Sequence, residues 1–218
     1  MKKKLVITFI GLFLIITVIL LNIDSKPAQS KNEETVLPSI EHDVLNDFEQ
    51  AVNQAVEKMP YSFQYVLTEP DYSTNSESRT RIHEEKIAFR NQVENQLFNF
   101  NQSIEDIEQR SKERAKTLKG AIDTAEEQYE ITITEDEIDT YIETNIAPVE
   151  FEQKTIYAEA LGLTQRELDF VFDRDIYLMD VLWEQLMPAL VADYPRQDDE
   201  SSNEHSQRLE EFFYSNAN

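Results

Sequence analysis

The chain has 218 residues and a net charge of −23, with 20 lysines and arginines against 43 aspartates and glutamates. Because so acidic a surface repels nucleic acid and anionic lipid headgroups, we expect no nucleic-acid partner. The absence of cysteine excludes disulfides, thiolate metal sites and lipid attachment through cysteine. With only three glycines, the composition favours helices joined by short turns.

The N-terminal segment predicts export from the cytoplasm. Three lysines at positions 2–4 precede an uninterrupted apolar run from Leu5 to Leu21, long enough to span a membrane as a helix. We therefore expect a single-pass cell-membrane protein with a cytoplasmic N-terminus and an extracytoplasmic domain. The alternative is a cleaved signal peptide, with secretion after cleavage near Ser30. Residues 1–30 hold four lysines and one aspartate, so the exported part carries −26.

The predicted fold class is all-α, with one N-terminal transmembrane or signal helix followed by a multi-helix extracytoplasmic domain containing one long helix. We divide the chain into a membrane or signal segment at 1–23 and a linker at 24–38. A helical domain at 39–192 and an acidic polar tail with a short closing helix at 193–218 follow.

The first half of the exported part contains two predicted helical regions. Apolar residues at three- and four-residue steps predict a helix from near Ser39 to Met59, ended by Pro60. An apolar patch within 60–78 predicts a short strand or an ordered loop. From Arg79 a long pattern predicts one continuous helix, or two collinear helices separated at Ser103, where Asp106 completes a capping pattern. Its apolar seam consists of Phe89, Val93, Leu97, Phe100, Ile104 and Ile107.

The second half is punctuated by two capping boxes. Thr134 with Glu137 predicts the start of a helix that stops near Pro148, and a further helix runs from about Val149 to Leu161. Gly162 suits the position after that helix. Thr164 with Glu167 opens the most apolar helix of the domain, from about Gln165 to Met187, which Pro188 ends or kinks.

These turns carry a resemblance to a known family. The carrying residues are Ala121-Ile122-Asp123, the stretch from Tyr129 to Asp139, and the stretch from Ala160 to Leu168. From Ala115 to about Leu190 the sequence resembles the N-terminal helical domain of the SurA/PrsA class of exported folding factors. The resemblance implies helical hairpins of that type and chaperone-like binding of unfolded polypeptides. The glycine-rich signature of the parvulin isomerase domain is absent, since no glycine follows Gly162.

The sequence offers no recognisable catalytic or metal-binding motif, and we expect no catalytic residue, no metal site and no cofactor. His42, His83 and His205 are widely separated and are expected at the surface, because the H-E-x-x-H spacing is missing. The acidic clusters lack the alternating oxygens and central glycine of a calcium loop.

The most apolar helix supplies the candidate binding residues. Phe172, Leu178, Leu182 and Leu186 are expected in the core. The candidates for a groove that binds unfolded or secreted polypeptides are Phe170, Tyr177, Met179 and Trp183, because aromatic and methionine side chains suit adaptable recognition. An alternative interpretation places these side chains in the core as well.

The leading functional hypothesis is a membrane-tethered, non-catalytic, chaperone-like module that binds exported polypeptides. The second is a structural or regulatory helical interaction protein of the cell envelope, with homodimer formation through the helix from Phe89 to Ile107. The third is a foldase related to peptidyl-prolyl isomerases, which the missing isomerase signature disfavours.

Overall fold

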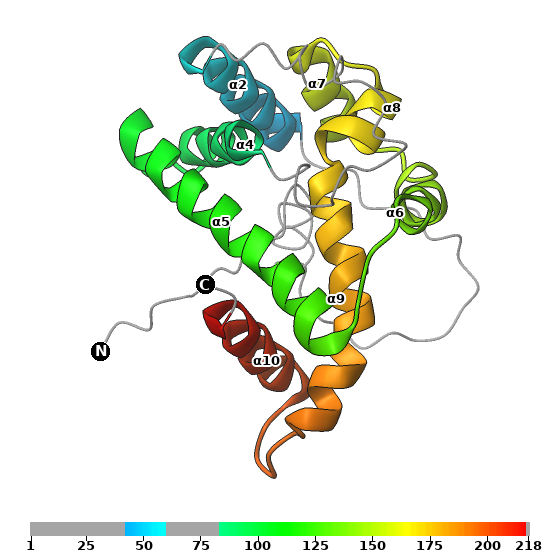
Figure 1. Ribbon diagram of the computed structural model, residues 1–218. Coiled ribbons are helices and arrows are strands. Elements are labelled where there is room, and N and C mark those ends of the chain that lie inside the picture. The colour runs from blue at the N-terminus through cyan, green and yellow to red at the C-terminus, as the bar shows by residue number, and fades with distance from the viewer. Residues whose placement is uncertain (1–41, 60–82, 217–218) are drawn as a thin grey trace, which may run out of the picture. The chain divides into compact units, whose positions relative to one another are not determined.

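The computed structural model describes residues 42–59 and 83–216, and these residues form helices and no strand (Figure 1). The all-α prediction is confirmed for these ranges. The chain divides into two units, Met1–His42 and Asp43–Asn218, and the described helices belong to the second apart from His42. The predicted membrane segment from Leu5 to Leu21, the linker and the apolar patch at 60–78 lie outside the described residues. No helix in the described ranges is both long and apolar enough to cross a membrane.

The described part of the chain contains eight α-helices and two π-helical turns. The π-helical turns each directly continue a preceding helix. In chain order the elements are α2 His42–Lys58, α4 Glu84–Leu97, α5 Ile104–Tyr129, α6 Glu135–Tyr141, η2 Ile142–Ile146, α7 Glu152–Leu161, α8 Gln165–Glu167, η3 Leu168–Phe172, α9 Arg174–Asp193 and α10 Ser202–Asn216.

Helices α4 and α5 form an antiparallel hairpin, so the predicted continuous or collinear helix is wrong. The chain reverses over residues 98–103, where Asn99 and Asn101 take left-handed backbone angles with φ of 53° and 55°. Ser103 caps α5 by accepting a hydrogen bond from the backbone amide of Asp106 at 3.1 Å, as its capping pattern predicted. Across the hairpin, the Asn91 amide donates to the Ser111 hydroxyl at 2.8 Å.

The hairpin also divides the predicted apolar seam. Phe89, Val93 and Ile107 are at most 3% exposed and face the interior of this chain. Phe100 and Ile104 are exposed at the turn. The residues from Phe89 to Ile107 therefore do not form one continuous face on which a second copy could pair.

The main core is built by α5, α6, η2, α9 and α10. The predicted core residues Leu178, Leu182 and Leu186 are all at most 1% exposed, and Leu209 and Phe213 of α10 belong to the same cluster. A second cluster is aromatic and joins α2, α4, α7 and η3; its rings, with centroids 5.9–6.3 Å apart, belong to Phe48, Phe89, Tyr157 and Phe172.

The predicted turns are confirmed. Thr134 with Glu137 and Thr164 with Glu167 both form complete capping boxes, in which each partner bonds the other's backbone amide. Gly162 ends α7 with a φ of 69°, a conformation that glycine adopts without a steric penalty. Residues 131–133 lie between α5 and α6 in non-helical conformation, as their β-branched side chains indicated.

The predicted helix from Gln165 to Met187 differs in two ways. It is divided by η3 and by Asp173, whose amide donates to the Leu168 carbonyl five residues earlier at 2.8 Å. Of the two alternatives given for Pro188, an end of the helix at this residue is wrong, because α9 continues past it to Asp193. The short closing helix expected within the acidic tail at 193–218 is the 15-residue helix α10, which contributes Leu209 and Phe213 to the core.

The second capping box provides a direct stability test. In Thr164→Ala, the Glu167 amide loses its acceptor, and we expect a loss of about 1 kcal/mol in the free energy of unfolding. That corresponds to a decrease of about 2–4 °C in the midpoint of thermal unfolding followed by circular dichroism. Thr132→Ala, at an exposed position outside a helix, is the matched control, and an equal effect in both variants would contradict the capping role.

Candidate polypeptide-binding surface

Buried charges fix the start of α9 against α4. The guanidinium of Arg90 donates two hydrogen bonds to the Asp175 carboxylate, at 2.6 and 3.0 Å, although Asp175 is only 2% exposed. The ammonium of Lys86 lies 4.0 Å from the same carboxylate and donates to the Val171 carbonyl at 2.8 Å. Removing one partner of a buried ion pair is strongly destabilising, so these contacts restrict how α9 begins.

Two further buried carboxylates neighbour this pair. Asp173 lies 3.2 Å from the Nε of Arg90, and Asp169 lies 2.6 Å from the ammonium of Lys154 on α7. The cluster as a whole is neutral, because three cations balance three carboxylates. The cations are Lys86, Arg90 and Lys154, and the carboxylates are those of Asp169, Asp173 and Asp175. The contacts of this cluster join η3 and the start of α9 to α4 and α7, and it lines neither of the two grooves described below.

Helix α9 is also joined to α6 by a charged contact. Arg174 pairs with Glu135 at 2.7 Å and with Asp139, and it donates to the Glu135 carbonyl at 3.2 Å. One turn apart on α6, the two carboxylates hold a single guanidinium. This contact brings α6 alongside α9.

The four predicted binding residues lie on two consecutive elements, Phe170 on η3 and the other three on α9. Phe170, Tyr177, Met179 and Trp183 are all partly buried against the main core, and none of them lines either groove described below. Three of them contact side chains on three different elements. The guanidinium of Arg166 on α8 lies 4.1 Å from the centroid of the Phe170 ring. The ring centroids of Tyr141 on α6 and Tyr177 are 6.3 Å apart, as are those of Tyr214 on α10 and Trp183. Each of the four therefore packs partly against the core and keeps some exposed surface, and Tyr177 contacts the Tyr141 ring that lines one of the grooves.

A groove of about 430 Å³ lies between α6, η2 and α9. We call it the α6–α9 groove. Tyr141 and Val181 contribute apolar surface, and carboxylates from both helices stand around them. Its lining residues are Asp136, Glu137, Thr140, Tyr141, Thr144, Asn145, Val181 and Glu184. Next to it, Gln185 of α9 donates to Glu137 of α6 at 3.0 Å, which ties the two walls together.

The carboxylate of Asp180 lies close to this groove and has a perturbed pKa. Burial and the neighbouring charge of Glu184 raise the pKa of Asp180 to about 6, against a lowering by its hydrogen bond with Tyr141. The same surroundings raise the pKa of Tyr141 to about 12. In the buried cluster, burial likewise raises the pKa of Asp173 to about 6.

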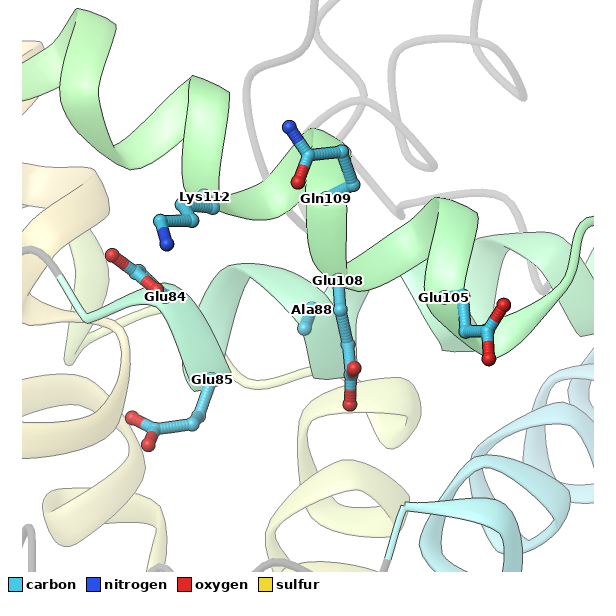
Figure 2. Close-up of a pocket in the computed structure, with 7 residues that line it drawn as sticks. All are labelled: Glu84, Glu85, Ala88, Glu105, Glu108, Gln109 and Lys112. Carbon is cyan, nitrogen blue, oxygen red and sulfur yellow. The ribbon is translucent and has the colours of Figure 1, made fainter.

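A second groove, of about 380 Å³, lies between α4 and α5 (Figure 2). Figure 2 shows glutamates from both helices around Ala88, with the ammonium of Lys112 pointing toward the side of Glu84. Its lining residues are Glu84, Glu85, Ala88, Glu105, Glu108, Gln109 and Lys112. Sequence reasoning missed this groove because a continuous helix would have kept residues 84–88 and 105–112 about 30 Å apart.

The histidine prediction was wrong for one residue. His205 is 7% exposed, and its Nε2 lies 2.8 Å from the Tyr194 carbonyl, where it helps to hold α10 against the end of α9. The side chain of His42 is outside the described residues, and His83 is half-buried. Within the described ranges, no group of histidine, aspartate and glutamate side chains is arranged to hold a metal ion.

Comparisons with protein-family models, with curated proteins and with solved structures found no match. The resemblance to the SurA/PrsA class therefore stays a prediction carried by the turns of the sequence.

The raised pKa of Asp180 predicts a pH dependence of stability. In the folded chain Asp180 keeps its proton up to about pH 6, whereas in the unfolded chain it loses it near 3.8. The unfolding free energy should therefore fall as pH rises between these values. Asp180→Asn should flatten this slope and stabilise the protein at pH 7.5 by on the order of 1–2 kcal/mol.

Denaturant unfolding at half-unit pH steps measures this effect. Asp198→Asn, at an exposed position, controls for the loss of one negative charge from an acidic protein. An Asp180→Asn variant with the slope of the parent chain would contradict the assignment.

The pair of Lys154 and Asp169 predicts a marked asymmetry between single and double substitutions. Lys154→Met leaves the 3%-exposed Asp169 carboxylate without its cation, and we expect a loss of about 3–5 kcal/mol in the unfolding free energy. Lys154→Met with Asp169→Leu removes both charges and should recover most of that loss. Chemical denaturation of the three proteins tests this, and a double variant as unstable as the single one would refute it.

Proposed function

We propose that this chain is a non-catalytic, chaperone-like module that binds unfolded or secreted polypeptides on the extracytoplasmic side of the membrane. In this proposal the apolar run from Leu5 to Leu21 is the tether. The resemblance of two turns to the SurA/PrsA class supports the proposed function. In these turns Thr134 caps the start of α6 and Thr164 caps the start of α8. The parvulin signature is missing, so binding rather than isomerisation is the expected activity.

The observation that carries the proposal is the composition of the α6–α9 groove. Tyr141 and Val181 offer apolar contact area, whereas Asp136 and Glu184 place negative charge on opposite walls. Thr140, Thr144 and Asn145 add groups that can hydrogen-bond with an extended backbone. An apolar surface with such a border suits polypeptide segments that mix lysine or arginine with aromatic or aliphatic residues.

The net charge of the exported part supports the same preference. A domain of −26 attracts cationic chains over a distance of about one Debye length, and it repels other copies of itself. A homodimer through the residues from Phe89 to Ile107 is less well supported, because Phe89, Val93 and Ile107 are enclosed within the chain.

Suppression of aggregation is the direct test. The full-length chain in detergent micelles, at severalfold molar excess, should slow the light scattering of reduced lysozyme, a basic client. It should act less on reduced α-lactalbumin, an acidic client. The absence of any effect on both clients, relative to empty micelles, would refute the proposed function.

A charge-reversed variant locates the activity in the groove. Asp136→Lys with Glu184→Lys should weaken protection of reduced lysozyme by about threefold, because each exposed charge contributes a few tenths of a kcal/mol. The control, Glu127→Lys with Asp198→Lys, changes the net charge equally at exposed positions that line neither groove. Equal losses in both variants would indicate a general charge effect and would exclude this groove as the site.

A further inference from the structure

The turn of the α4–α5 hairpin displays apolar side chains to solvent. Phe98, Phe100 and Ile104 are 46%, 49% and 40% exposed, and the centroids of the two phenylalanine rings are 5.6 Å apart. We call residues 98–104 the hairpin tip. No ionisable residue occurs from Asn95 to Ile104, although charged residues make up 29% of the chain.

Hydrogen bonds hold the hairpin tip in this shape. The Asn95 side chain accepts from the Gln102 amide at 3.0 Å and donates to the Gln102 carbonyl at 3.3 Å, which closes the turn. The Phe100 amide donates to the Asn95 carbonyl at 3.2 Å, and the Asn101 side chain donates to the Asn99 carbonyl at 2.9 Å. The exposed rings therefore belong to a preorganised loop, and little ordering is required for them to bind a surface.

Two residues of the hairpin tip, Asn99 and Asn101, take left-handed backbone angles. Both residues alternate with the phenylalanines, and asparagine tolerates this conformation better than most side chains. The turn thus combines two asparagines in left-handed conformation with two exposed aromatic rings. Exposed apolar groups gathered on one uncharged turn indicate a contact surface.

A lipid surface fits this turn better than an acidic or basic protein surface, because residues 98–104 carry no charge. The charged groups that bond to them, Arg110 to Gln102 and Asp106 to Ser103, lie on α5 outside the hairpin tip. The tether proposed above also keeps a bilayer close. Only 20 residues, 22–41, separate the apolar run from α2, and fully extended they span at most about 70 Å. Elsewhere the strongly acidic surface resists anionic headgroups, so an uncharged tip is well suited to approach the membrane.

We propose that the hairpin tip inserts Phe98, Phe100 and Ile104 into the interfacial layer of the membrane that tethers the chain. This inference rests on the tether in the proposed function, and it does not require any client. A tether combined with a shallow second contact is stronger than either alone, since the second contact forms within one molecule. Glu105 and Asp106 directly follow the tip, so a zwitterionic bilayer should accept it better than an anionic one.

The absence of native cysteine makes a site-specific label straightforward. Phe98→Cys and Phe100→Cys, each of which retains the other phenylalanine, would carry a spin label in the full-length chain in phosphatidylcholine vesicles. Glu127→Cys, at an exposed position on α5, is the control. The measurement is the ratio of label collisions with oxygen, which concentrates in lipid, to collisions with a water-soluble nickel chelate.

We expect this ratio at positions 98 and 100 to exceed that at 127 severalfold, and the difference to shrink in vesicles rich in phosphatidylglycerol. Labels at 98 and 100 as accessible to the chelate as the label at 127 would overturn the proposal. So would labels that lose contact with both reagents, because a protein surface would then cover the tip. Unchanged circular dichroism of the labelled variants would show that the fold is retained.

Vesicle flotation distinguishes this proposal from the function on which it rests. A chain that fails to float with the vesicles lacks the tether, which overturns the proposed location and this inference together. A chain that floats with an immersed tip but fails to protect reduced lysozyme retains the membrane contact and loses only the chaperone function.

Discussion

The pairing of Arg90 with Asp175 is the contact on which the arrangement of the described helices depends. It joins side chains 85 residues apart, on α4 and at the start of α9, where the Asp175 side chain is 2% exposed and the Arg90 side chain 17%. Removing such groups from water is costly, and the cost is offset only when several hydrogen bonds form together. The position of α9 is thereby restricted, and α6 and α10 both pack against α9.

Charge is distributed very differently inside and outside this domain. The buried cluster balances three cations with three carboxylates, whereas the exported part as a whole carries −26. Balanced charges inside specify one geometry, while the excess outside governs which molecules can approach. The negative potential of the exterior acts on all exposed surfaces, but their own composition differs. The α6–α9 groove, bordered by carboxylates, favours cationic segments, whereas the uncharged hairpin tip favours an apolar contact.

Local signals in the sequence predicted much of the fold. Both capping boxes and the turn at Gly162 depend on neighbouring residues and were correctly placed, and the cap at Ser103 matches one of the two alternatives that the sequence left open. The reversal at 98–103 was missed because heptad spacing continued across it, whereas the side-chain bonds of Asn95 to Gln102 turn the chain back. The grooves depend on contacts between distant helices, which periodicity cannot reveal, and so the candidate residues on α9 were identified by type rather than by location.

The π-helical turn η3 has a consequence for the length of this segment. It accommodates one more residue than an α-helical turn would, immediately before the buried Asp173 and Asp175. Each residue of an α-helix advances the direction of the side chains by about 100°. Deleting a single residue within 168–172 would therefore rotate the segment before the deletion by about 100° relative to the carboxylates after it, even if every remaining side chain were kept. At this point in the chain, the number of residues is under as strict a physical constraint as their identity.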